Sequence, residues 1–157
     1  MKITIMAVGC TTTPYIAKAT DDYIGRACHY MPVEMLTVAD IRQTRSLTMQ
    51  QQRDKEGEQL LQSFQPSDMV VLLDEHGREM TSRQFAGYIE RQAVSGRRRL
   101  VFVIGGPYGF SDAVRSRADA MISLSQMTFS HEMVRLFFAE QIYRAMTILR
   151  GEPYHHD

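Results

Sequence analysis

The chain has few cysteines, no long apolar run and no net charge, and each of these features excludes a class of protein. Two cysteines in 157 residues are too few for a disulfide framework, so we expect Cys10 and Cys28 to be plain thiols in a reducing cytoplasm. The cysteines and five histidines match no common metal-binding spacing, so we expect no metal site. No apolar stretch is long enough to cross a bilayer, and Met1–Val8 is too short and too alternating for a signal peptide. We therefore expect a cytoplasmic protein with no membrane partner.

The usual phosphate-binding motifs are also absent. The turn Gly105-Gly106-Pro107-Tyr108-Gly109 lacks the spacing of a Rossmann fingerprint, and no P-loop Lys-Ser/Thr pair occurs in the chain. Phosphate binding by this turn is therefore not supported. Two interpretations stay open, a structural bend and a turn whose backbone approaches a cofactor that carries no phosphate.

What is present is the composition of an ordinary globular protein. Apolar residues make up 44% and charged residues 23%, and the length fits a single domain over residues 1–157. The charge is unevenly distributed. Residues 1–77 include 7 basic and 10 acidic residues, for a net charge of −3, whereas residues 78–157 include 11 basic and 8 acidic residues, for a net charge of +3. Of the 18 basic residues 15 are arginine, whose planar fork suits phosphate. This distribution permits nucleic-acid binding without requiring it.

Strand and helix patterns alternate along the chain. We predict strands at Lys2–Val8, Val33–Val38, Met69–Leu73, Leu100–Ile104 and Ala120–Leu124, and helices at Pro14–Cys28, Thr48–Phe64, Ser82–Val94, Ser111–Ala118 and Glu132–Arg150. A polar loop is expected at Asp40–Leu47, and Asp74 to Gly77 should end the third strand. Continuously apolar strands are covered on both faces, so the prediction is an α/β fold with a parallel sheet and helices on both faces.

Three of these loops should meet. In open parallel sheets ligands bind beyond the carboxyl ends of the strands, where Leu73, Gly105 and Leu124 lie. The segment Leu124–Phe129 mixes small polar and apolar residues and could wrap an adenine; the alternative is a plain connection without a ligand. Together the loops predict a cofactor pocket.

Two polar features flank the last predicted helix. His131 lies at its start, where the helix N-terminus favours a neutral imidazole and hence a base; the alternative is a capping or surface histidine. After Gly151 the tail Pro153–Asp157 combines an aromatic ring, two imidazoles and a carboxylate. Chain ends are commonly frayed, but this composition indicates a tail folded over an active site.

The last helix is apolar over a wide arc. Val134, Phe138 and Ile142 lie on one stripe, and Met133 and Phe137 begin a second. A helix of this kind is buried on more than one side. We interpret one side as facing the sheet and the other as facing a homodimer partner, the alternative being a tightly covered helix within one subunit.

At this point the residues match a known family. The chain resembles the RlmH family of SPOUT-class RNA methyltransferases, which modify pseudouridine in large-subunit (23S) ribosomal RNA. The resemblance covers nearly the whole length and is specific in the order and spacing of its segments. The segments are Ala7-Val8-Gly9, Asp54-Lys55-Glu56-Gly57-Glu58, Leu73-Asp74, Ile104-Gly105-Gly106-Pro107 with Gly109, Ser123-Leu124-Ser125 through Thr128, His131, Val134-Arg135, Ala139-Glu140, Tyr143-Arg144-Ala145 and Pro153-Tyr154-His155.

The resemblance implies a SPOUT fold with a deep C-terminal trefoil knot, an obligate homodimer, and S-adenosyl-L-methionine as methyl donor. It implies methylation of ring nitrogen 3 of a pseudouridine, on assembled ribosomes and without a metal. The family's cofactor contacts carry over to Leu73, Gly105, Leu124, Ser125, Gln126, Met127, Thr128 and Phe129. As groups around the target base we predict His131, Tyr154 and His155, and as contacts to RNA phosphate Arg135 and Arg144.

The chain departs from the family at two positions. Many members have Glu where this chain has Tyr108, and many end in Tyr-His-Arg where this chain has His156. These changes keep two alternatives open, a non-catalytic RNA- or ribosome-binding module and a methyltransferase for a different RNA, such as transfer RNA.

Overall fold

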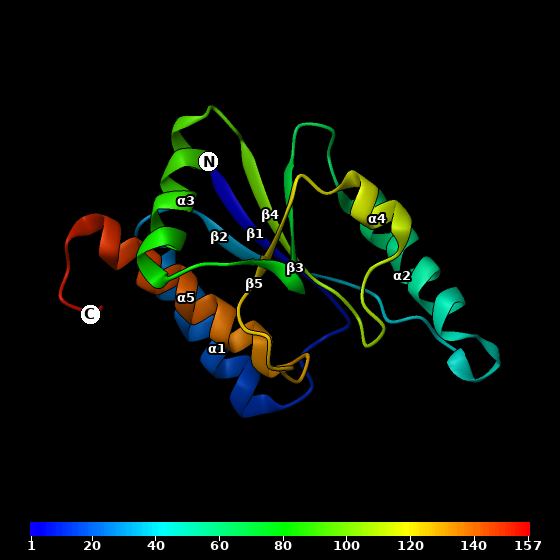
Figure 1. The fold of residues 1–157 in the computed structure, drawn as a ribbon. Coiled ribbons are helices and arrows are strands. Elements are labelled where there is room, and N and C mark those ends of the chain that lie inside the picture. The colour runs from blue at the N-terminus through cyan, green and yellow to red at the C-terminus, as the bar shows by residue number, and fades with distance from the viewer.

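Five parallel strands form the centre of the computed structural model, which describes residues 1–157 (Figure 1). Their order across the sheet is β2-β1-β4-β3-β5. The strands are β1 Lys2–Val8, β2 Val33–Val38, β3 Met69–Glu79, β4 Arg99–Ile104 and β5 Ala120–Ser123, and the helices are α1 Pro14–Ala27, α2 Met49–Ser63, α3 Ser82–Val94, α4 Asp112–Arg117 and α5 Met133–Arg150, with a 3-10 turn at Thr44–Ser46. The predicted α/β fold is confirmed.

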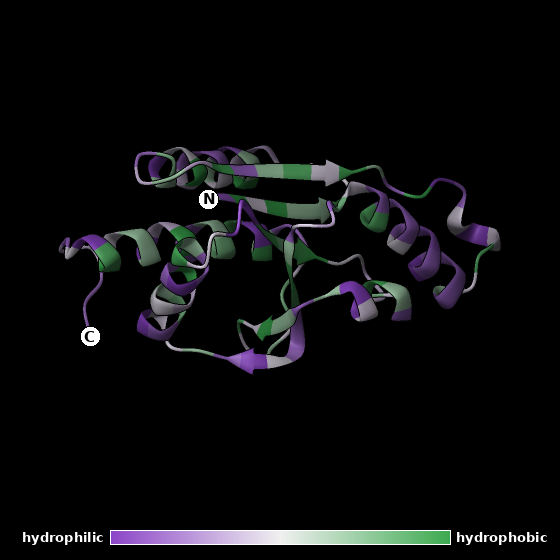
Figure 2. Cartoon of the chain, turned by 90° about the horizontal axis from the view of Figure 1, so that it is seen from above, coloured by the Kyte–Doolittle hydropathy of each residue, from purple (hydrophilic) through white to green (hydrophobic).

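Helices cover both faces of the sheet, as Figure 2 shows. Successive residues of a strand point to opposite faces, and β4 divides its side chains in this way. Leu100, Phe102 and Ile104 join a core with α1, α3 and α5. Val101 and Val103 join a second core with α2 and α4. The continuously apolar strand is therefore buried on both sides, as its sequence predicts.

Local signals in the sequence fix the helix starts. Thr48 with Gln51 and Thr81 with Gln84 form capping boxes at α2 and α3. Ser111 caps α4 by accepting the Val114 N–H at 3.3 Å. The predicted helix ends agree with the structure to within one or two residues because these capping signals are local.

Gly57 lies inside α2, where the sequence alone suggests only a weakened helix. The structure gives the residue a packing role. A methyl group at this position would overlap Ser111 Oγ at the start of α4 and crowd Val114. The glycine therefore permits the close approach of α2 and α4.

One boundary prediction is wrong. The third strand was expected to end at Leu73, but β3 continues to Glu79. It does so across a shift in register, because Leu73 and Arg78 both pair with Ile122 of β5. The segment between them, residues 74–77, bulges out of the ladder, and the alternation in the sequence breaks there while the backbone pairing resumes.

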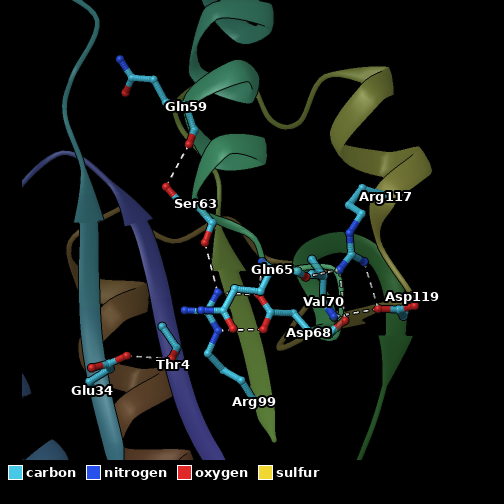
Figure 3. A network of polar contacts seen from close by, with 10 residues as sticks. All are labelled: Thr4, Glu34, Gln59, Ser63, Gln65, Asp68, Val70, Arg99, Arg117 and Asp119. Atoms are coloured by element: carbon cyan, nitrogen blue, oxygen red, sulfur yellow. Dashed lines mark hydrogen bonds and ion pairs between the residues drawn. The ribbon is translucent and has the colours of Figure 1, made fainter. Parts of the chain in front are cut away.

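A polar network closes the amino-terminal edge of the sheet (Figure 3). Asp68 is buried and accepts from Arg99 Nε at 2.8 Å, while Arg117 donates to the carbonyl oxygens of Gln65 and Asp68. Asp119 accepts the Val70 N–H at 2.8 Å. These bonds join the starts of β3, β4 and β5 at the edge opposite the loops discussed next.

None of the helices combines the length and apolarity that spanning a membrane requires. Cys10 and Cys28 are exposed and form no disulfide.

Candidate active site

A cavity of about 680 Å³ opens at the carboxyl ends of β3, β4 and β5. The three loops expected there meet, since Leu73, Gly105 and Leu124 all line it. Of the further residues predicted to contact a cofactor, Met127, Thr128 and Phe129 line this cavity, whereas Ser125 and Gln126 do not. Its volume lies in the range of small-molecule sites.

The loop from Leu124 to Phe129 is shaped by its own serines. Ser123 Oγ donates to the Ser125 carbonyl at 3.0 Å, and Ser125 Oγ accepts the Met127 N–H at 3.0 Å. Ser125 therefore supports the loop, while Gln126 borders a shallower neighbouring hollow. Phe129 packs against Phe137 of α5 with ring centroids 5.4 Å apart, which anchors the end of the loop.

The glycine turn after β4 is held from below by a buried acid. The Glu56 side chain of α2 lies against Gly106, so closely that a methyl group on Gly106 would overlap Glu56 Oε2. Glu56 Oε1 accepts from Gln52 at 2.9 Å, but Oε2 is buried without a hydrogen-bond partner. Burial raises the pKa of Glu56 above its ordinary value; the Gln52 hydrogen bond opposes this shift and the Asp40 charge adds to it. A side chain at position 106 would therefore have to displace the Glu56 carboxylate.

The bulge in β3 places charged groups on the opposite wall. Asp74 pairs with Arg115 of α4 at 2.8 Å and accepts the His76 N–H at 2.9 Å, and all three residues line the cavity. Burial alone would raise the pKa of Asp74, but these hydrogen bonds outweigh burial and hold it below its ordinary value. Sequence reasoning missed Arg115 and His76; the position of Asp74 just beyond a buried strand is the signal that could have found this wall.

His131 lies in the turn before α5 and its side chain lines the cavity. Ser130, not His131, caps the start of α5. Its Oγ accepts the Met133 N–H at 3.1 Å, and its carbonyl oxygen accepts the Val134 N–H at 3.0 Å. His131 is exposed, so its ring is open to a ligand or to solvent. The capping interpretation is therefore wrong; an exposed position fits both a surface histidine and a functional one, and the catalytic role of His131 stays a prediction.

The neighbouring Glu132 ties this turn to the start of α1. Its carboxylate accepts from the Thr13 hydroxyl at 2.8 Å, from the Thr13 N–H at 3.1 Å, and from Thr12. These bonds, the Thr13 hydroxyl first, lower the pKa of Glu132 to about 2. A carboxylate at the N-terminus of α1 also complements the helix dipole. The first helix and the turn that carries His131 are therefore fixed relative to each other.

Arg135 requires a correction. It was predicted to contact RNA phosphate, but its side chain is buried and its guanidinium is already occupied. It donates to the carbonyl oxygens of Val8 at 2.8 Å, Gly9 at 2.7 Å and His131 at 3.0 Å. A guanidinium enclosed in this way joins β1 to α5 and has no face left for RNA. The sequence could not show this because two of the three carbonyls, those of Val8 and Gly9, belong to residues more than 120 positions away.

The C-terminal tail is folded, but not over the cavity of its own subunit. It follows α5, whose 18 residues span about 27 Å from the cavity. There the Tyr154 hydroxyl donates to Glu140 at 3.0 Å and its ring lies beneath Arg144, 4.8 Å from centroid to guanidinium. Arg144 also pairs with Glu140 at 2.6 Å and lies 3.2 Å from His155 Nδ1. The structure thus brings Tyr154, His155 and Arg144 together and leaves them apart from His131.

Burial is the largest cause that raises the pKa of Tyr154 well above its ordinary value, and the bond to Glu140 adds to it. The phenol therefore stays protonated at neutral pH. It acts here as a hydrogen-bond donor that orders the tail.

The fold matches that of solved methyltransferases. A tRNA methyltransferase from Aquifex aeolicus aligns with a TM-score of 0.56 at 15% identity, covering 100% of this chain and 76% of that one. A probable methylase family protein from Haemophilus influenzae aligns with a TM-score of 0.54 at 11% identity, covering 99% of this chain and 70% of that one. The parallel sheet with a cavity at its carboxyl edge is thus an α/β fold shared with these methyltransferases.

Sequence relatives define the family. A family model described as predicted SPOUT methyltransferase matches residues 1–155. A Parabacteroides distasonis protein named ribosomal RNA large subunit methyltransferase H is 53% identical over 157 residues, covering 100% of both chains, and a Christiangramia forsetii protein of the same name is 50% identical over 156 residues, covering 99% of both. The chain belongs to the SPOUT methyltransferase family, which confirms the resemblance seen in its sequence.

Proposed function

We propose that the chain, acting as one domain over residues 1–157, methylates large-subunit ribosomal RNA at ring nitrogen 3 of a pseudouridine in the cytoplasm. The observation that carries this proposal is the identity of about half of all residues, over the full length, with proteins named for that RNA. The cavity at the carboxyl edge of the sheet supports it, because each predicted loop contributes to one wall.

We propose S-adenosylmethionine as the occupant of the cavity. Its walls suit a nucleoside with a polar tail, since they combine exposed glycine backbone at Gly105 and Gly106 with the apolar side chains of Leu73, Leu124 and Phe129. When bound, this cofactor supplies a methyl group on a cationic sulfonium. The loops of the chain would orient that group toward the open side of the cavity and exclude water.

Ring nitrogen 3 of a pseudouridine carries a proton and becomes a good nucleophile only after losing it. His131 is the base candidate, because it is exposed at the cavity mouth and is not used as a cap.

Tyr154 and His155 enter this mechanism only if a second copy of the chain brings its tail to the cavity. The tail stands away from the cavity of its own subunit, and Phe137 and Met127 leave apolar surface open, with 44% and 77% of their area exposed. These features support a homodimer in which each site is completed by the partner.

The trefoil knot implied by the resemblance belongs to the same proposal.

The test is to incubate the protein with S-adenosylmethionine and ribosomes and to locate the methylated nucleotide by mass spectrometry. Methylation of a pseudouridine in large-subunit RNA is expected. A product in transfer RNA would favour the alternative RNA substrate. If calorimetry detects no binding of cofactor at millimolar concentration, the non-catalytic module is favoured. This alternative is tested because Tyr108 and His156 stand where many family members have Glu and Arg.

A further inference from the structure

The segment between β2 and the middle of α2, residues 39–53, projects from the body of the protein; we call it the arm. In Figure 1 the arm, in cyan to green, extends farthest from the sheet on the side of α2. None of its residues is buried. Because it starts at the carboxyl end of β2, it leaves the sheet at the same edge as the cavity.

The end of the arm lies near the glycine wall of the cavity. Arg53 lies one helical turn before Glu56, so the two side chains share a face of α2. Glu56 lies against Gly106, which lines the cavity. The arm is therefore joined to that wall through Glu56, although none of its own residues lines the cavity.

The arginines of the arm have no acidic partner. Six arginines elsewhere form ion pairs, including Arg99, Arg115 and Arg144, but Arg42, Arg45 and Arg53 form none. The Nε of Arg53 is buried and lacks a hydrogen-bond acceptor. An unused donor of this kind is costly unless a ligand supplies the acceptor.

The charge of the arm is positive overall. Its three arginines face one carboxylate, Asp40, giving a net charge of +2. The Asp40 carboxylate lies so close to Gly9 that a methyl group there would overlap it, so it is directed toward the body rather than along the arm. The outer part of the arm therefore carries cations alone.

The backbone of the arm is held in a costly conformation. Gln43 has φ 57° and is the one residue other than glycine with a positive φ. It precedes the 3-10 turn Thr44–Ser46, so Arg42 lies just before Gln43 and Arg45 lies within the turn itself. Strain of this kind costs about 1–3 kcal/mol and collects at functional segments.

We propose that the arm binds the phosphate backbone of the RNA next to the target nucleotide, with Arg42 and Arg45 as its principal contacts. This proposal rests on the proposed function, since it names the surface that holds that substrate. It replaces the phosphate contact that buried Arg135 does not offer. Guanidinium groups with no internal partner pair readily with phosphate and read no base sequence.

The test compares two double variants that remove equal charge. R42A/R45A changes the arm, and R97A/R98A changes two exposed, unpaired arginines in the turn before β4, at the edge of the sheet away from the cavity. Binding of a protein-free large-subunit RNA fragment is measured over a range of salt concentrations. For R42A/R45A the slope of log affinity against log salt should fall by roughly 1.4–1.8, for two lost phosphate contacts, while R97A/R98A should stay near wild type.

Two further measurements make the result decisive. Calorimetry with S-adenosylmethionine should give the wild-type affinity for both variants, which shows that the fold and the cavity are intact. KM for RNA should rise in R42A/R45A alone.

An unchanged salt slope for R42A/R45A overturns the proposal, as does an equal decrease of the salt slope in R97A/R98A. A loss confined to intact ribosomes also overturns it, because it assigns the arm to a ribosomal protein. If wild type itself transfers no methyl group to ribosomal RNA, the proposed function fails instead.

Discussion

Glu56 and Gly106 show how single residues set the shape of the cavity. The carboxyl group of Glu56 occupies the space that a side chain at position 106 would need. The glycine turn looked ambiguous in the sequence, since a structural bend and a ligand-binding turn share the same residues. The structure shows that a buried acid shapes the turn and that the turn lines the cavity, while binding of a ligand by its backbone stays a prediction.

We predict that Gly106→Ala weakens binding of S-adenosylmethionine at least tenfold. The added methyl group must displace either the buried Glu56 carboxylate or the turn, and either shift changes the wall that faces the cofactor. Calorimetric titration measures the effect, and Gly25→Ala, at an exposed position of α1 with open space around it and no positive φ, controls for a general loss of fold. Equal affinity of G106A and wild type would contradict the steric role.

We predict that Glu56→Gln stabilises the protein at neutral pH. The pKa of Glu56 is raised in the fold, so stability declines as pH rises from the ordinary pKa of 4.5 to the raised value and stays lower above it. Glutamine does not ionise and avoids this loss. Melting curves at pH 7.5 and pH 4 should show a higher melting temperature for E56Q at pH 7.5 and nearly equal values at pH 4. An equal difference at both pH values would show that ionisation is not the cause.

At the scale of elements, the strands and helices follow the sequence closely. Leu100–Ile104 and Ser82–Val94 were recognisable because apolar runs and capping residues are local signals. The continuation of β3 was not, because the pairing of Arg78 and Glu79 with β5 depends on residues more than 40 positions later. The same limit applies to the site: its loops were predicted, but the walls made by Glu56 and Arg115 come from helices on the far side of the sheet.

The helix α5 shows how one pattern can have two causes. Its wide apolar arc is explained in part inside one subunit, because α5 packs between α1 and α3 over the sheet. Phe137 nevertheless stays 44% exposed. Packing within one subunit is therefore confirmed for the side of α5 that faces the sheet, α1 and α3, while the dimer contact of the exposed side stays a prediction.

The ion pair that joins the starts of β3 and β4 permits a stability prediction (Figure 3). The Asp68 side chain is fully buried and that of Arg99 is 14% exposed, so Asp68→Asn leaves a largely buried cation unpaired. We expect a loss of about 3 kcal/mol in the free energy of unfolding at pH 7. Urea denaturation measures it, with exposed Asp54→Asn as the control.

The same pair should weaken in acid. Burial alone would raise the pKa of Asp68, but the bonds from Arg99 and the Gln65 N–H lower it. Its contribution is therefore present above the ordinary pKa of 3.8 and is lost as pH falls through the lowered folded-state value. The gap between wild type and D68N should narrow near pH 2, and a gap that stays constant with pH would show that the charge of Asp68 is not its source.

At the scale of the whole molecule, the decisive question is whether each site uses the tail of the other subunit. We predict that His131→Ala and His155→Ala are each inactive in methyl transfer to ribosomes while both still bind cofactor. When the two are mixed and allowed to exchange subunits, half of the dimers carry one intact cavity facing one intact tail. Activity should return to about a quarter of the wild-type rate.

The mixing experiment separates the two arrangements cleanly. If the tail acted on its own subunit, every site in the mixed dimers would lack one histidine and no activity would return. A single variant that kept full activity would remove its histidine from the mechanism. The control is a mixture of two differently labelled wild-type preparations, in which energy transfer between the labels shows that subunits exchange.

The bond network around Arg135 has a consequence for the time at which the protein becomes functional during its synthesis. The central pair of strands, β1 and β4, is separated by some 90 residues, and the end of β1 is held by an arginine of the last helix. β1 can pair with nearby β2 first, but it has all of its final partners only after the ribosome has released the chain through Arg135. Before that point the turn that carries His131 is not fixed against the start of α1. The nascent protein therefore stays catalytically silent until the residues of α5 have left the ribosome.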